Sequence, residues 1–273
     1  MSARETAFES RRMPRFPVLA LLHPREQMRA VVIMSIIGLL LWAAAVWVAR
    51  LPVWIASALV LVLLLVPGVR KWLADRHRYG STIMTLSILL AAQGFHSVEH
   101  TVQWIQFHIL KWPPFASSGL ISAANAEWVH FVWNWAVVAV TLYLVRGGMR
   151  NRWAWVLVAW SLAHALEHAY MLVRYLEMVQ ELQRLGFPSL SAQGLPGVLG
   201  RDGWLARSSV TQGTFICRLP GVTTAPRIDI HFWWNAGEIL WLTLAANAFL
   251  RTRLKSSDTR GNDLAIALVA DQN

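Results

Sequence analysis

The sequence contains a single cysteine, Cys217, among 273 residues. One cysteine excludes an intrachain disulfide and the Cys-x-x-Cys-His motif that attaches haem covalently. Charged residues are also scarce, at 15%, whereas 56% of the residues are hydrophobic and 16 are tryptophan. This is not the composition of a soluble globular domain. It indicates a protein that is solvated largely by lipid.

Six apolar runs are long enough to cross a bilayer as helices, because about 20 residues of helix span about 30 Å of hydrocarbon. The sequence therefore predicts an all-α fold, a polytopic membrane bundle of about six transmembrane helices. The predicted spans are residues 29–49, 52–68, 82–108, 127–146, 153–176 and 230–250.

The formal net charge of +10 comes mainly from arginines that flank the spans in four groups. With six spans, all four groups fall on one side of the membrane, which the positive-inside rule identifies as the cytoplasm. Both termini are then cytoplasmic. Because the charges flank spans instead of sharing one face, they do not indicate a nucleic-acid site. The Arg-rich, Lys-poor composition favours a bacterial inner membrane.

Two histidine patterns occur twice, in the same order. "HSVEH" at 96–100 matches "HALEH" at 164–168, and "HFVWN" at 130–134 matches "HFWWN" at 231–235. Each copy is one span with HxxEH followed by one span with HFxWN, on helices that run in the same directions. The sequence therefore predicts a tandem repeat with a pseudo-two-fold axis along the membrane normal, as in transporters built from parallel repeats.

The predicted organisation follows from these spans and this repeat. The first two spans form a hairpin that buttresses the repeat. The loop 177–229 is a predicted lid over the outer surface, because loops of this length without structure of their own are usually functional or disordered. The predicted parts are a cytoplasmic basic arm at 1–28, the buttress hairpin at 29–68, repeat halves at 82–146 and 153–250, and a cytoplasmic tail at 251–273.

The six histidines of the repeat are expected at one depth, in the outer half of the bilayer, because the matching helices cross the membrane in matching directions. Positions i and i+4 of a helix share a face, and i+3 borders it. Six imidazoles and two carboxylates in a four-helix core suit a dinuclear site of iron, copper, zinc or manganese. The predicted metal ligands are His96, Glu99, His100, His130, His164, Glu167, His168 and His231.

Other polar residues of these helices have predicted roles around the metals. Glu99 and Glu167 are the candidate catalytic groups, as bridging ligands or proton acceptors. The predicted cofactor-binding residues lie one or two turns further inward. Their expected role is to hydrogen-bond a metal ligand or to act as weak ligands themselves. These residues are Asn134, Asn235 and Glu238.

Three other interpretations of the cluster stay open at this point. Histidines in membrane helices often only link helices by hydrogen bonds, and ionisable residues at membrane depth also form proton relays. Haem b is the main alternative cofactor. Two histidines one turn apart would crowd a porphyrin, however, and a carboxylate between them would add nothing, so the ligand set favours a metal pair, with iron or copper first.

The function that these residues predict is a metal-dependent membrane oxidoreductase acting on a lipid-soluble or periplasmic small molecule. Its expected partners are the lipid bilayer, the small-molecule substrate and a membrane or periplasmic redox partner. The alternatives are a protein that transports or delivers metal ions, and a b-type haem or non-catalytic subunit of a larger membrane complex.

Overall fold

The chain is all-helical. The computed structural model describes residues 16–187 and 194–270, without the side chains of Ala124 and of residues 254–270. No strand occurs within those residues. Parts of three predicted segments lie outside the described residues: 1–15 of the arm, 188–193 of the lid and 271–273 of the tail.

Six long helical segments make up most of the structure. They are α2 (Met28–Ala43), which continues into a π-helical turn at Ala44–Val48, α3 (Val53–Tyr79), α4 (Ser81–His108), α5 (Glu127–Arg146), α6 (Arg152–Arg184) and α8 (Arg227–Ala270). The short elements are α1 (Pro17–Leu22), α7 (Trp204–Arg207) and single 3-10 turns at Arg25–Gln27, Ser122–Asn125 and Phe215–Arg218.

Five of the helical segments are long and apolar enough to cross a membrane, which indicates a multi-pass membrane protein. The predicted sixth span, 230–250, lies within α8, which is not one of these five among the described residues. The six-span topology therefore stays a prediction. The five are Arg25–Val48, Val53–Tyr79, Ser81–His108, Glu127–Arg146 and Arg152–Arg184.

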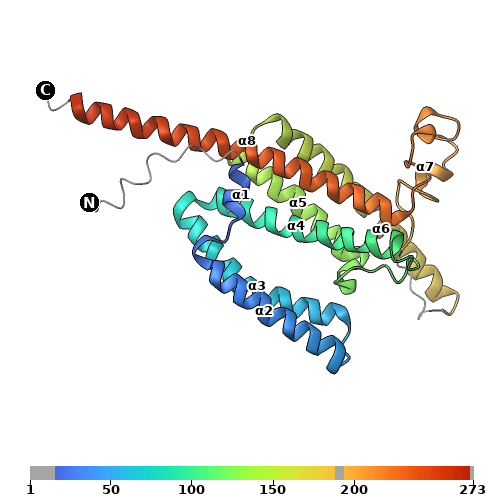
Figure 1. Cartoon of the computed structure of the whole chain (residues 1–273). Coiled ribbons are helices and arrows are strands. Elements are labelled where there is room, and N and C mark those ends of the chain that lie inside the picture. Colours follow the sequence, from blue (N-terminus) through green and yellow to red (C-terminus); the bar gives the residue numbers. More distant parts are fainter. Residues whose placement is uncertain (1–15, 188–193, 271–273) are drawn as a thin grey trace.

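The helices α4, α5, α6 and α8 form a bundle, and the α2–α3 hairpin lies along one side of it (Figure 1). Within the bundle α4 packs along α8, and α6 packs along α5. The helices α4 and α6 end, and α5 and α8 begin, at the end of the bundle next to the segment that carries α7 (Figure 1). We call this the histidine end, and the opposite end the arginine end.

The apolar core lies in the half of the bundle nearer the arginine end. It combines leucines of α4 with buried residues of the three other bundle helices and of α1. Apolar side chains of the α2–α3 hairpin are instead mostly exposed, which costs little where lipid is the solvent. The core includes Leu86, Leu89, Leu90, Val137, Leu144, Leu157, Leu242 and Phe249.

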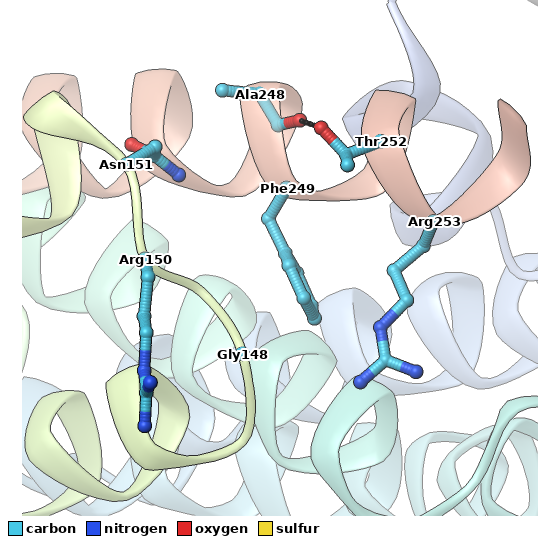
Figure 2. Close-up of a pocket in the computed structure, with 7 residues that line it drawn as sticks. All are labelled: Gly148, Arg150, Asn151, Ala248, Phe249, Thr252 and Arg253. Atoms are coloured by element: carbon cyan, nitrogen blue, oxygen red, sulfur yellow. Dashed lines mark hydrogen bonds between the residues drawn. The ribbon is translucent and has the colours of Figure 1, made fainter. Parts of the chain in front are cut away.

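A hollow of about 390 Å³ opens at the arginine end, between the α5–α6 turn and α8 (Figure 2). Arg150 and Arg253 line it, and Arg253 donates a hydrogen bond to the Gly147 carbonyl (3.0 Å). The hollow begins at Ala248, about 25 Å along α8 from His231 at 1.5 Å per residue. It is therefore separate from the histidines, and its arginines belong to the positive charge of this end.

A glycine controls how closely α8 approaches α6. A Cβ atom at Gly237 would overlap the indole of Trp160, whose Nε1 donates to the Trp234 carbonyl (2.9 Å). We expect Gly237→Ala to destabilise the folded bundle by about 1–3 kcal/mol, because overpacking forces the ring off its position. Thermal unfolding in detergent measures this. Gly94→Ala in α4 is the control, since its Cβ has no described atom within 4 Å. An unchanged melting temperature for Gly237→Ala would contradict this packing.

Candidate metal centre

Four helices bring six imidazoles together near the histidine end. The helix α4 contributes His96 and His100 one turn apart, and α6 contributes His164 and His168 with the same spacing. One further histidine comes from the first turns of each of the two helices that begin there, His130 of α5 and His231 of α8. All are buried except His96, which is half-buried.

The six rings form one continuous cluster. The two rings on α4 are 4.7 Å apart between centroids, and the two on α6 are 4.9 Å apart. Two nearly parallel stacks join α4 to α8 and α5 to α6. His100 stacks on His231 at 5.8 Å with an interplanar angle of 9°, and His130 stacks on His168 at 5.1 Å with an angle of 12°.

Three of these histidines can hold a metal ion. One nitrogen each from His96, His100 and His130 lies within 4.8 Å of the other two. In the other half, Nε2 of His164 and Nε2 of His168 are 3.2 Å apart. Two nitrogens bound to one tetrahedral ion at about 2.0–2.1 Å are about 3.3–3.4 Å apart, so this pair also has the spacing of ligands to a shared ion.

Several ring nitrogens of the cluster are buried and have no hydrogen-bond partner within the described part of the chain. A buried polar atom left without a partner costs about 1–3 kcal/mol. The atoms are Nε2 of His96, Nε2 of His100, Nδ1 of His130, Nδ1 of His164 and Nδ1 of His168. For His96, His100 and His130 a metal ion is the species that would use such lone pairs at once, so this donor set fits one. In His164 and His168 the atoms without a partner are instead the Nδ1 atoms, not the two Nε2 atoms that face each other.

Hydrogen bonds fix which nitrogen of His100 faces the cluster. Asn125 Nδ2 donates to the Ser118 carbonyl (2.7 Å), so Asn125 Oδ1 accepts from Gln103 Nε2 (2.8 Å). Gln103 Oε1 must then accept from Nδ1 of His100 (2.9 Å). A neutral imidazole that donates through Nδ1 keeps its lone pair on Nε2, the nitrogen without a partner among the described residues.

His231 is oriented in the same way by its own helix. Its Nδ1 lies 3.0 Å from the carbonyl of Arg227, one turn earlier. Because a carbonyl only accepts, Nδ1 carries the proton and Nε2 carries the lone pair. Arg227 itself pairs with the buried carboxylate of Glu127 (2.6 Å) and donates to the Leu195 carbonyl (3.0 Å), which ties α8 to α5 and to the loop before α7.

The carboxylates of the two HxxEH motifs accept hydrogen bonds from loop amides. Glu99 accepts from the N–H groups of Leu120 and Ile121, both at 2.8 Å. Glu167 accepts from those of Val198 and Leu199, at 3.0 and 3.3 Å. Each carboxylate therefore anchors the loop that follows its helix. Their predicted roles as ligands or proton acceptors stay predictions.

A glycine lies against each of these carboxylates. A Cβ atom at Gly119 would overlap Oε1 of Glu99, and one at Gly197 would overlap Oε1 of Glu167. Only a residue without a side chain lets the loop approach closely enough for both amides to reach the carboxylate. We call the two arrangements the Glu99 latch and the Glu167 latch.

The two asparagines of the HFxWN motifs are buried and make the same contact. Nδ2 of Asn134 donates to the carbonyl of His130, and Nδ2 of Asn235 donates to that of His231, both at 2.9 Å. Their Oδ1 atoms have no partner within residues 16–187 and 194–253. Each asparagine oxygen is therefore available to a further donor or to a metal ion.

A polar chain lies one to two turns towards the arginine end from the imidazoles. Trp133 Nε1 donates to Gln93 Oε1 (2.9 Å), and Gln93 Nε2 donates to Glu238 Oε2 (2.5 Å). The other oxygen of Glu238 lies 3.5 Å from Nδ1 of His164. Glu238 is among the site residues that the sequence predicts, whereas Gln93 is not. The signal was present, since Gln93 precedes His96 by three residues and His100 by seven, on the same face of α4.

Two tryptophans line the cluster on that side. The Trp133 indole lies 5.5 Å from the ring of His96, and the Trp234 indole stacks on His164 at 5.2 Å and 6°. Outside the cluster, His108 pairs with Asp229 (2.5 Å) and joins the end of α4 to the start of α8. His108 is therefore a helix contact and not part of the centre.

Comparison with known proteins gives no match to a protein family, to a curated protein or to a solved structure.

Proposed function

We propose that the six histidines bind a pair of metal ions and that the protein is a metal-dependent membrane oxidoreductase. The observation that carries the proposal is the convergence of six imidazoles from four helices. One buried ring nitrogen each of His96, His100 and His130 lacks a partner among the described residues, and Nε2 of His164 faces Nε2 of His168. Neutral imidazole suits copper, iron and zinc. Of these, copper and iron would supply electron-transfer chemistry.

The proposed ligands divide into two sets of three. The first set is His96, His100 and His130, and the second is His164, His168 and His231. We leave Glu99 and Glu167 out of both sets, because loop amides bind both oxygens of Glu99 and Oε1 of Glu167.

A tandem repeat with a pseudo-two-fold axis is part of the proposal, and matched contacts support it. Exchanging the halves turns the stack of His100 on His231 into the stack of His168 on His130, and both are nearly parallel. The same exchange turns the α4–α8 packing into the α6–α5 packing. It also interchanges the two latches. These correspondences involve different loops and helices, so one packing preference does not account for all of them.

We propose six membrane spans, with α8 as the sixth and the histidine end outside the cytoplasm. Arg150 and Arg253, which line the hollow of Figure 2, lie at the other end, and positive charge of this kind favours the cytoplasmic side. The centre would then lie in the outer half of the bilayer, within reach of a lipid-soluble or periplasmic small molecule. Electrons would pass between that substrate and a membrane or periplasmic redox partner.

Transport or delivery of metal ions is a less suitable function for this site. Beyond Gln93 and Glu238 the bundle interior is the apolar core of leucines, valines and alanines. A cation moving towards the arginine end would have to cross that core, where the buried hydroxyls of Ser87 and Thr141 do not make up a ligand set. Haem also fits poorly, because the neighbouring rings are 4.7–6.2 Å apart and leave no porphyrin-sized gap among these described side chains.

Elemental analysis of the protein purified in mild detergent tests the proposal. We expect about two metal ions per chain, and an optical spectrum with charge-transfer bands of iron or copper. A Soret band would replace the metal pair by haem, and a spectrum silent in the visible with two zinc ions would remove the redox function. Protein that neither contains metal nor takes it up on addition of Fe²⁺, Cu²⁺ or Zn²⁺ would contradict the proposal entirely.

A further inference from the structure

The polar chain from Trp133 through Gln93 to Glu238 places its carboxylate against only one of the two histidine sets. Glu238 and Gln93 are each 1% exposed, and His164 is fully buried at 0%. A carboxylate so far from water is costly unless it is paired or hydrogen-bonded. Gln93 satisfies one oxygen of Glu238. The other oxygen has no hydrogen-bond partner in the described chain, and its neighbour at 3.5 Å is Nδ1 of His164, which likewise lacks one.

The equivalent positions of the other half carry no such chain. By the alignment of the two HFxWN motifs, Glu238 corresponds to Val137, and by that of the HxxEH motifs Gln93 corresponds to Ser161. Val137 is buried and belongs to the apolar core. Ser161 is also buried, and its hydroxyl has no partner in the described structure. His96, the counterpart of His164, is therefore not supported by an equivalent acid.

We infer that Glu238 is a positioning residue that makes the two metal positions unequal, by holding His164 with its Nδ1–H towards the carboxylate and its Nε2 towards the metal. The inference rests on the proposed metal pair. Nε2 of His164 already faces Nε2 of His168 at 3.2 Å, so this orientation directs the lone pair of His164 at the position where an ion shared with His168 would bind. Gln93 holds the carboxylate in place, and the indole of Trp133 holds Gln93.

The consequence is ordered loading. A carboxylate that accepts from a ligating imidazole makes that imidazole a better donor, and removing such a partner typically weakens metal affinity by about 10–100-fold. The negative charge of Glu238 also offsets part of the charge of a nearby cation in a region of low dielectric. The position at His164, His168 and His231 should therefore fill first, and the position at His96, His100 and His130 second.

Titration of metal-free protein with Co²⁺, followed by its visible d–d bands, tests this inference. We expect the wild type to bind two ions in two separate steps with different spectra. Glu238→Gln should weaken the tighter step by about 10–100-fold and change its bands, while leaving the weaker step unchanged. Gln93→Ala, which keeps the carboxylate but removes its support, should weaken the same step by a smaller factor. Ser161→Ala, at the matching position of the other half, is the control and should change neither step.

The outcomes separate this inference from the proposed function. Two bound Co²⁺ ions with no selective effect of Glu238→Gln, or an equal loss of both steps, would overturn the role of Glu238 and leave the metal pair intact. Wild-type protein that binds no Co²⁺ would overturn both. Elution as a single species in detergent shows whether Glu238→Gln is folded. If it is not, the Gln93→Ala titration decides, and an unchanged tighter step then overturns the inference.

Discussion

Replacing His100 and His168 together with alanine is expected to remove both metal ions from the purified protein. Each histidine belongs to a different proposed set, and each also forms one of the two stacks that join the halves. Structural zinc sites with four ligands bind their ion with an apparent free energy of about 10–16 kcal/mol, which is about 3 kcal/mol for each ligand. By that measure, each imidazole removed should weaken metal binding roughly 100-fold. Ions held by the two imidazoles left in each set would be lost during purification.

The matched control is His108→Ala. This histidine lies on the same helix as His100, two turns further on, but its partner is Asp229 and not the cluster. We expect His108→Ala to retain about two metal ions per chain. Elemental analysis of both variants, each checked for a single elution peak, gives the result. If the double variant keeps the metal content of the wild type, these imidazoles are not the ligands.

The limits of the helices were predictable to different extents. Residues 82–108 and 127–146 were predicted almost as they are observed, at Ser81–His108 and Glu127–Arg146, because polar residues or turns bound the apolar runs. The helices α3 and α6 extend beyond the apolar runs, to Tyr79 and Arg184. Hydropathy marks where a helix leaves the hydrocarbon, whereas helix formation depends on backbone hydrogen bonds and continues into water.

Proline illustrates the same limit within α3. The predicted span 52–68 ends at a proline and a glycine, Pro67 and Gly68, and both residues disfavour the interior of a helix. The helix nevertheless continues through Pro67 and ends at Gly80, whose φ of +86° lies in the left-handed region. The stop signal that operates is therefore the glycine, 13 positions later. A proline inside an apolar helix is tolerated when its surroundings satisfy the freed carbonyl.

The histidine cluster can be predicted from the sequence because the histidines recur at helical spacing. Spacing of i and i+4 puts two imidazoles on one face, and the recurrence of both motifs in the same order predicts that the other helices present theirs at the same depth. The partners of the glutamates were not accessible in this way. Glu99 follows His96 by three residues and precedes His100 by one, which places it at the border of that face, and the amides that it meets come from a loop 21 and 22 residues later. Helical periodicity carries no information about the path of such a loop.

The second large effect is expected from the glycine of the Glu167 latch. Gly197→Ala would place a methyl group where Oε1 of Glu167 now accepts from the Val198 and Leu199 amides. Two hydrogen bonds to a charged group are worth about 1.5–3 kcal/mol each, so the loop should open at least 100-fold more often. Trypsin cleavage after Arg201 or Arg207, in the segment that this latch holds, measures the opening directly. We expect cleavage to be faster by that factor.

The control for this experiment is Gly213→Ala, in the same segment between α6 and α8. Gly213 has a φ of +79°, so alanine there strains the backbone, but its Cβ meets no described atom within 4 Å. Faster cleavage in Gly197→Ala than in Gly213→Ala separates loss of the latch from simple strain in the loop. Glu167→Gln should fall between them, because the amide keeps one accepting oxygen but loses the charge that strengthens both bonds. Cleavage of Gly197→Ala at the wild-type rate would mean that other contacts hold this loop, and that Glu167 is free for a role at the metal centre.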